Sequence, residues 1–208
     1  MLGRGANSRA ILAPLLTAAT LLVLLAGCVS TRTVVTADET WQQRRTRLQG
    51  LDQFAFKGRL AAAVKNDGFN ASLQWQQQGG QSDIDLRAPL GFGSVHIVRD
   101  GERFALQTSR GEKLDGDAAL ASLATRLGFA PPLDALRYWI LGVPAPQRPA
   151  VETPSIDARY LTALEQDGWR VQYEEYRPLA GSGVPMPRRA QLTRADARLR
   201  LIVDEWTL

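Results

Sequence analysis

Apolar and polar side chains alternate along much of this chain. The cleanest stretch is residues 69–76, where every second residue is apolar and the residues between are Asn, Ser or Gln. A period of two predicts a β-strand with one buried face. Turn residues such as Asp100-Gly101 and Asp167-Gly168 separate similar runs, so we expect about eight to eleven short antiparallel strands. The expected strands are 54–64, 69–76, 83–87, 95–97, 104–106, 160–164, 169–176, 188–194 and 198–206.

A short helix is expected ahead of the first strand. Thr40 can cap a helix over residues 41–49, because a threonine hydroxyl accepts from the free N–H groups of the first turn. The helical spacing places Arg45 on the same face as Trp41 and Leu48. One face of this helix therefore has the apolar residues needed to pack on a sheet.

Two more helices are expected in the middle of the chain. Asp117 can cap a helix that runs to Leu127 and stops at Gly128. A second, unusually apolar helix is expected between Pro132 and Gly142. Residues 144–154 contain several prolines and are expected to form a connection without regular structure.

The tally of elements predicts a mainly β fold with a few helices. A sheet with one apolar face must bury that face, and two or three short helices are too few to cover so many strands. The expected solutions are a strongly curved, partly closed antiparallel β-barrel or a sandwich, with the helices covering one side. Periodicity alone does not distinguish a filled core from an apolar cavity.

The N-terminus has the pattern of a secretory signal that ends in a lipid-modified cysteine. Arg4 and Arg9 precede an uncharged apolar run, which ends in Leu25-Ala26-Gly27-Cys28 and resembles a bacterial lipobox. We therefore expect residues 1–27 to be removed, Cys28 to carry lipid at the start of a tether over 28–39, and residues 40–208 to form a single domain. The alternative is an ordinary signal peptide or short membrane anchor with an incidental cysteine.

The residue after Cys28 bears on the destination of the protein. In the sorting pattern of many Gram-negative bacteria, an aspartate at this position retains a lipoprotein in the inner membrane, whereas this chain has Val29. The expected location is the outer membrane, anchored in its lipid, with the domain in the periplasm. Several acyl chains would make this anchor stable, because each buried methylene contributes ~0.8 kcal/mol.

Composition and charge exclude several classes of protein. The 208 residues carry a net charge of +4, and removal of residues 1–27 takes away two arginines, leaving +2. This weak basicity, without a run of lysines and arginines, disfavours nucleic acid as a partner. Because Cys28 is the only cysteine, neither an internal disulfide nor a multi-cysteine metal site is possible.

The residues available for catalysis are few. His96 is the only histidine, and the chain has no Gly-x-Ser-x-Gly or Ser-x-x-Lys motif. Gly91-Phe92-Gly93 lacks the third glycine of a phosphate loop. The pairs Asp83/Asp85 and Glu174/Glu175 fit solvated strand faces better than paired catalytic carboxylates. We therefore expect no enzyme activity, no cofactor and no metal.

The loop over residues 88–93 invites a functional interpretation. Pro89 and the glycines set a turn that carries Leu90 and Phe92 between two strands. Both side chains could fold back onto the core. Alternatively Leu90 protrudes, and an exposed leucine beside an apolar cavity would be suited to enter lipid.

Several of these landmarks together resemble LolB, the outer-membrane lipoprotein receptor family of the Lol sorting pathway. The similarity spans essentially the whole mature chain, and its most specific part is Trp139-Ile140-Leu141-Gly142-Val143-Pro144. The other matching segments are Trp41, Gly58-Arg59, Trp75-Gln76-Gln77, Ala88-Pro89-Leu90-Gly91, Arg137-Tyr138, Gly168-Trp169-Arg170-Val171 and Leu201 through Trp206.

The resemblance implies an unclosed β-barrel with a helical lid over a hydrophobic cavity. Such a receptor accepts acylated lipoproteins from the periplasmic carrier LolA, without a nucleotide, and releases them into the outer membrane. Leu90 occupies the position of the family's protruding leucine, which is associated with membrane delivery. Phe92 adds a second apolar side chain at a position where we expected a smaller or more polar residue. We expect a monomer.

The inward faces of the strands and the apolar helix supply the residues expected to line an acyl-chain cavity. These are Phe54, Phe56, Leu60, Leu73, Trp75, Ile84, Leu86, Leu106, Leu136, Trp139, Ile140, Tyr173, Leu201 and Val203. About half of them are expected to be ordinary core residues instead. The alternative function is a structural or assembly-accessory lipoprotein with a filled core that binds proteins at a sheet edge. A periplasmic hydrolase using His96 or a carboxylate pair is a third hypothesis.

Overall fold

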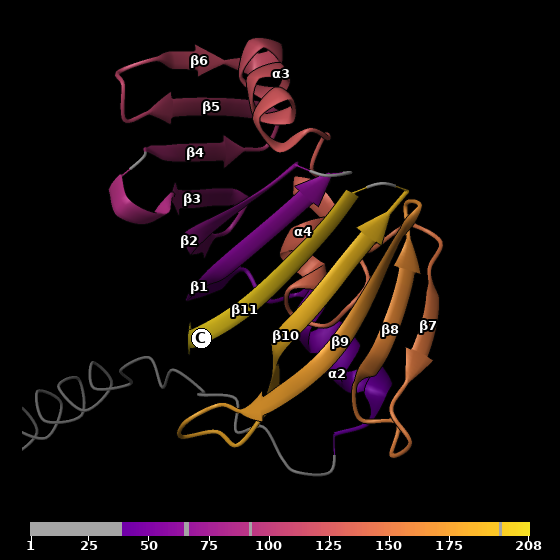
Figure 1. Ribbon diagram of the computed structural model, residues 1–208. Helices are drawn as coiled ribbons and strands as arrows, with labels where there is room; N and C mark the ends of the chain where they lie inside the picture. Colours follow the sequence, from indigo (N-terminus) through magenta and orange to yellow (C-terminus); the bar gives the residue numbers. More distant parts are fainter. Residues whose placement is uncertain (1–38, 65–66, 92, 196) are drawn as a thin grey trace, which may run out of the picture. The chain divides into compact units, whose positions relative to one another are not determined.

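The computed structural model describes residues 39–208 except 65–66, 92 and 196, and within them eleven strands form one antiparallel sheet (Figure 1). The strand order is β6-β5-β4-β3-β2-β1-β11-β10-β9-β8-β7, so the first and last strands of the chain meet at the centre. The strands are β1 (Gln53–Val64), β2 (Asp67–Gln78), β3 (Gln81–Arg87), β4 (Ser94–Asp100), β5 (Arg103–Thr108), β6 (Lys113–Asp115), β7 (Val151–Pro154), β8 (Leu161–Gln166), β9 (Trp169–Pro178), β10 (Pro185–Arg194) and β11 (Ala197–Thr207).

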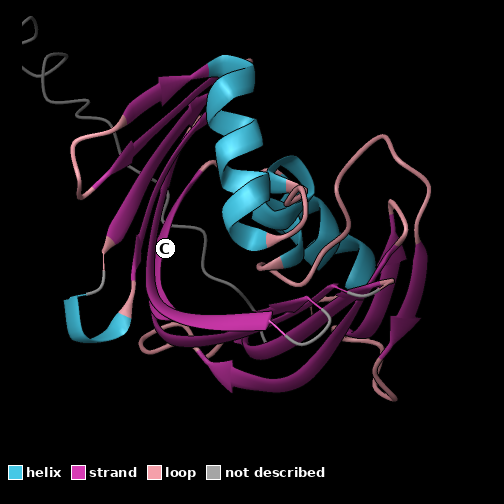
Figure 2. Cartoon of the chain, turned by 45° about the horizontal axis from the view of Figure 1, so that its top comes forward, coloured by secondary structure: helices cyan, strands magenta, loops and turns pink. Residues whose placement is uncertain are grey.

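In the described residues, the sheet curves around the helices, which lie on its concave side (Figure 2). The helices are α2 (Trp41–Gln49), α3 (Gly116–Leu127) and α4 (Leu133–Trp139). The sheet ends at β6 on one side and at β7 on the other, so it is an unclosed barrel. The predicted fold class, a mainly β unclosed antiparallel barrel with a few helices, is confirmed.

The strands β6 and β7 were not predicted from the sequence. Each has only three or four residues, too few for an alternating pattern to be recognised. β7 lies in the segment that we expected to be an irregular, proline-rich connection. Its proline, Pro154, is at the end of an edge strand, where the missing backbone N–H does not interrupt pairing with another strand.

The helix α2 has the predicted bounds and the predicted cap. The Thr40 hydroxyl accepts a hydrogen bond from the Gln43 backbone N–H, and the Gln43 side chain accepts one from the Thr40 N–H. Arg45 lies on the predicted face, because its guanidinium and the Trp41 indole N–H both donate to Glu152. The burial of Arg44 together with Trp41 and Leu48 was not predicted. The Arg44 guanidinium donates to the Pro185 carbonyl, and its burial lowers the pKa of Arg44.

The other two helices differ from expectation at their ends. Asp115 is at the N-cap position of α3, so Asp117 lies in the first turn instead of capping the helix, while Gly128 ends it with a positive φ of 76° as predicted. The helix α4 is shorter than predicted and ends at Trp139, after which Ile140–Gly142 form a turn. In the described residues, no helix is long and apolar enough to cross a bilayer.

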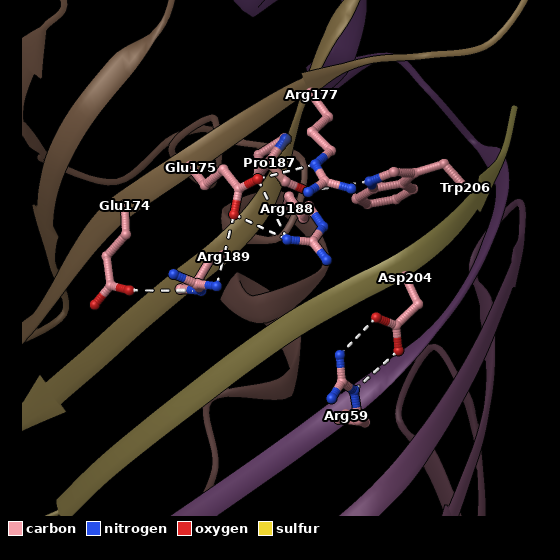
Figure 3. A network of polar contacts seen from close by, with 9 residues as sticks. All are labelled: Arg59, Glu174, Glu175, Arg177, Pro187, Arg188, Arg189, Asp204 and Trp206. Atoms are coloured by element: carbon pink, nitrogen blue, oxygen red, sulfur yellow. Dashed lines mark hydrogen bonds and ion pairs between the residues drawn. The ribbon is translucent and has the colours of Figure 1, made fainter.

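The contact between β1 and β11 joins the two ends of the chain. Gly58 faces Val203 at an irregularity in the pairing, where a Cβ on Gly58 would come within 2.2 Å of the Ile202 backbone oxygen. On the outer face, Arg59 of β1 donates two hydrogen bonds to Asp204 of β11, at 2.8 and 3.1 Å (Figure 3). Because Gly58 has no side chain, the backbones of β1 and β11 can approach closely at this point.

A second group of ion pairs crosses β9 and β10 on the same face (Figure 3). Glu175 accepts hydrogen bonds from Arg177 at 2.9 Å and from Arg188 at 3.0 Å. Burial raises the pKa of Glu175, but the hydrogen bonds and charges of the two arginines outweigh it, so that this pKa is lowered overall. Nearby, the Trp206 indole N–H donates to the Pro187 carbonyl at 3.1 Å.

Candidate functional site

An apolar cavity lies between the concave face of the sheet and the segment that contains α3 and α4. Its volume is about 70 Å³. Its wall is made of Leu60, Leu73, Ile84, Leu86, Ile97, Leu123, Leu127, Phe129, Pro131, Leu133, Leu136, Ile140, Leu192, Leu199 and Leu201. Every one of these side chains is a hydrocarbon, so nothing in the wall can hydrogen-bond a polar ligand or hold a metal.

The strand residues reach the cavity because side chains on a strand alternate between its two faces. Leu73 of β2 and Ile84 of β3 are 6% and 3% exposed, whereas the residues next to them in sequence point outward. On β11, Leu199 and Leu201 are likewise buried and face the cavity. The opposite wall comes from α3, from α4 and from the connection between them at residues 128–132. This helical segment, residues 116–140, is called the lid below.

The structure separates the predicted cavity residues into two groups. One group lines the cavity: Leu60, Leu73, Ile84, Leu86, Leu136, Ile140 and Leu201. The other group is buried in the core but does not line it: Phe54, Phe56, Trp75, Leu106, Trp139, Tyr173 and Val203. The strand residues of both groups follow the same alternation, and this explains why sequence alone did not separate them.

Several wall residues were not named in the prediction. Ile97, Leu192 and Leu199 lie in predicted strands, on the inward face, and the alternation could have identified them. The other unnamed residues belong to the lid: Leu123, Leu127, Phe129, Pro131 and Leu133. The connection between α3 and α4 has no regular period, so no sequence signal marked Phe129 and Pro131 as facing the sheet.

Two open recesses border the cavity. One has a volume of about 340 Å³ and shares Leu86, Leu123 and Leu127 with the cavity wall. The other, of about 820 Å³, shares Leu127 and Phe129. Leu127, the last residue of α3, therefore lines all three spaces.

The larger recess is bordered by both aromatic and charged residues. The rings of Phe129 and Trp169 are 5.5 Å apart between centroids, and Asp67, Arg126 and Arg194 also line the recess. Arg126 is neutralised by Glu112, with 2.6 Å between the charged atoms. The recess therefore combines an apolar end beside the cavity with a polar rim.

Buried polar contacts fix the C-terminal end of the lid. The Trp139 indole N–H donates to the Gln166 side-chain oxygen at 2.8 Å, and the Tyr173 hydroxyl donates to the Trp139 carbonyl at 2.8 Å. Gln166 also accepts from the Ala145 N–H and donates to the Ala145 carbonyl, so its buried amide is satisfied. Burial raises the pKa of Tyr173 well above its ordinary value. This end of the lid is therefore firmly attached to β8 and β9.

The loop between β3 and β4 presents an isolated leucine. Leu90 is 93% exposed at the centre of a 3₁₀ turn, η2 (Pro89–Gly91), so its side chain projects instead of folding onto the core. Its φ of 56° is left-handed, which is unfavourable for a leucine. The Ala88 N–H donates to the Gly93 carbonyl at 2.9 Å and closes the loop. Phe92 and the predicted acylation site Cys28 lie outside the described residues.

Comparisons with known proteins agree on one family. A family profile described as "Outer membrane lipoprotein LolB" matches residues 52–206. The curated protein "Outer-membrane lipoprotein LolB" of Nitrosococcus oceani is 35% identical over 190 residues, which cover 90% of this chain and 94% of that protein. The protein of the same name from Alkalilimnicola ehrlichii is 34% identical over 169 residues, covering 81% and 83% of the two chains.

Solved structures support the fold. A putative outer membrane lipoprotein-sorting protein domain from Vibrio parahaemolyticus matches with a TM-score of 0.51, covering 80% of this chain and 89% of that one, at 6% sequence identity. A DUF1329 family protein from Desulfovibrio piger matches with the same TM-score at 7% identity, covering 80% and 88%. At these identities the likeness concerns the fold alone.

Proposed function

Because the chain belongs to the LolB family of outer-membrane lipoproteins, we propose that its cavity receives the acyl chains of lipoproteins delivered through the periplasm. Family membership carries the role of lipoprotein receptor in the Lol pathway. The observation that supports acyl-chain binding is the wall of the cavity, which consists of hydrocarbon side chains contributed by both the sheet and the lid.

The size of the cavity indicates that the lid must move. A volume of about 70 Å³ is small, since one water molecule occupies ~30 Å³ in the liquid. An acyl chain of ~15 methylenes needs far more room, so the lid is closed in the conformation described here. Displacement of Leu127 would join the cavity to both recesses and provide the missing space.

The energetics favour direct transfer between proteins. Exposure of ~15 methylenes to water would cost ~12 kcal/mol, so the chains must pass between two apolar sites in contact. The partner that supplies them is the periplasmic carrier LolA, and the lipoproteins are the clients. Net transfer from the carrier to the receptor requires only a modest difference between their affinities for the acyl chains, because ~1.4 kcal/mol gives a tenfold bias. No nucleotide is needed for this step.

The processing of the N-terminus belongs to the same proposal. Removal of residues 1–27 and acylation of Cys28 would anchor the domain to the outer membrane through the tether 28–39. This arrangement would keep the receptor at the membrane where the clients are released. The mass of the mature N-terminal peptide tests it directly.

A binding experiment tests the cavity. A soluble form that begins at residue 29 is titrated with a fluorescent fatty acid, and saturable binding that an acylated lipoprotein displaces is expected. Leu127→Trp should weaken binding at least about tenfold by filling the junction of cavity and recesses. Leu120→Trp, on the same helix but 44% exposed and away from the cavity wall, is the matched control and should bind normally. Absence of saturable binding by the unaltered protein would favour the structural or assembly-accessory alternative.

A further inference from the structure

The outer face of β3 and β4 carries three side chains that can ligate metal ions. Asp83 and Asp85 are two residues apart on β3, and His96 of β4 is the cross-strand partner of Asp85. The neighbouring residues Ile84 and Ile97 line the cavity, so the three polar side chains are on the opposite face of the sheet. The proposed lipid-binding function therefore makes no use of this cluster.

The ion pairs of His96 with the two aspartates are longer than a usual charge-assisted hydrogen bond. His96 Nδ1 lies 3.3 Å from Asp85 Oδ1 and 3.6 Å from Asp83 Oδ1. Charge-assisted hydrogen bonds between N–H and a carboxylate are usually ~2.7–2.9 Å long. By contrast, two ligands at ~2.0–2.1 Å from a tetrahedral zinc ion are ~3.3–3.4 Å apart. One metal ion could thus be shared by the three side chains with little rearrangement, because their ligand atoms all lie within 4.8 Å of one another.

The surroundings of the two aspartates are also unusual for this arginine-rich domain. Several other exposed carboxylates on the strands pair with an arginine or a lysine, as Asp204 does with Arg59 and Glu205 with Lys57. In the part of the chain that the structure describes, the ion pairs of Asp83 and Asp85 are with His96 alone. Their cross-strand neighbours on β2 are glutamines. The cluster therefore has two carboxylates and one imidazole, and in the described residues no arginine or lysine pairs with these carboxylates.

We propose that Asp83, Asp85 and His96 bind one divalent transition-metal ion, for which zinc is a suitable probe. An imidazole nitrogen favours zinc, nickel or copper, whereas magnesium and calcium prefer sites made only of oxygen. The three side chains are 31–40% exposed, so water can complete the coordination. The site supplies three protein ligands from two paired strands, which hold them at fixed spacing.

The position of the site gives it a consequence for the Leu90 loop. β3 ends at Arg87 and β4 begins at Ser94, so the loop over residues 88–93 starts only three residues beyond Asp85. His96 is equally close to its other end. A metal ion bound here would hold together the two strands from which Leu90 projects, and would make the base of the loop more rigid.

Zinc titration of the full chain tests the proposal. The protein is purified in detergent without a polyhistidine tag, and binding is followed by calorimetry near neutral pH. We expect one zinc per chain with a dissociation constant of about 1–100 μM, and no comparable binding of magnesium. Because His96 is the only histidine in the chain, loss of binding in His96→Ala identifies the site.

Matched variants and a second measurement keep the outcome clear. Asp85→Asn should weaken zinc binding at least about tenfold, while Asp117→Asn, an exposed aspartate in the first turn of α3, should have no effect. Zinc should also raise the melting temperature of the unaltered protein and of Asp117→Asn but not that of His96→Ala. Zinc binding weaker than about 1 mM, or binding unchanged in His96→Ala, would overturn the proposal.

Discussion

Arg99 of β4 forms an ion pair with Asp134 of α4 and so connects the sheet to the lid. The neighbours of Asp134 on the helix include Leu133 and Leu136, both of which line the cavity. The two charged side chains are 23% and 54% exposed, so solvent screens their attraction. This contact is therefore a weak connection between the sheet and the lid.

Removal of this ion pair should open the lid more readily. We expect Arg99→Ala to change the free energy of unfolding by no more than ~1 kcal/mol. Loss of the ion pair should favour the open lid and accelerate uptake of the fluorescent fatty acid about two- to fivefold, as measured by stopped flow. The double variant Arg99→Asp/Asp134→Arg restores an ion pair and should return the rate toward its original value. An uptake rate that is the same in all three proteins would show that the pair does not restrain the lid.

The junction of β1 and β11 should not tolerate a side chain at Gly58. A Cβ there would lie 2.2 Å from the Ile202 backbone oxygen, which cannot move without disturbing the pairing of two central strands. We expect Gly58→Ala to lower the free energy of unfolding by roughly 2–4 kcal/mol. Thermal unfolding measures the loss, and Gly80→Ala, where a Cβ would meet only an Asp100 side-chain oxygen at 4.0 Å, is the control.

The sheet could be predicted well because most of its strands have one face on the core and one in solvent. The alternation along β2 and β9 is therefore visible in the sequence. The short edge strands β6 and β7 were missed because they are held by their neighbours and not by their own pattern. The burial of Arg44 was also missed, since it depends on a carbonyl that arrives from Pro185, far along the chain.

The candidate site was predictable only in part, for a different reason. Alternation identifies the side of the sheet that a residue faces but not whether the space in front of it is filled. Phe56 lies against Trp75, with 6.1 Å between ring centroids, and against Trp206 at 5.2 Å. These aromatic rings pack against one another, whereas a wall made mostly of leucines and isoleucines encloses a cavity. Whether an inward-facing residue meets a filled core or a cavity is decided by the packing of segments that are distant in the sequence.

Alkaline pH should destabilise the domain through its buried tyrosines. Burial raises the pKa of Tyr173, and burial likewise raises the pKa of Tyr176, whose hydroxyl donates to the Leu161 carbonyl. In the unfolded chain a tyrosine ionises near pH ~10, so unfolding above that pH releases protons and stability falls as pH rises. Below pH ~10 both tyrosines are neutral in the folded and in the unfolded chain, so the stability that they contribute is fully present.

We therefore expect the melting temperature to decrease from about pH 10 upward. Tyr173→Phe should be less stable near neutral pH by ~1 kcal/mol, because the hydrogen bond to the Trp139 carbonyl is lost. Its melting temperature should nevertheless decrease less steeply above pH ~10 than that of the unaltered protein. Equal slopes in the two proteins would mean that Tyr173 does not contribute to the alkaline loss.

Two substitutions of Leu90 should separate membrane delivery from folding. Leu90 is 93% exposed and has a left-handed φ of 56°, so its side chain contributes little to the core while its backbone conformation is unfavourable. Leu90→Gly removes the apolar tip and relieves the strain, and should stabilise the domain by about 0.5–1 kcal/mol. Leu90→Glu places a charge at the tip and should leave the fold intact.

Both variants should accept lipoproteins from the carrier at the normal rate but release them slowly into liposomes. The reason is that an apolar tip can enter the lipid surface, whereas a glycine gains no burial there and a glutamate loses its hydration. Release is measured as the fraction of a labelled lipoprotein that floats with the vesicles. The control is Ile156→Glu, a change at another fully exposed apolar residue in the turn between β7 and β8. If delivery by Leu90→Gly equals that of the unaltered protein, the leucine side chain is not the element that meets the membrane.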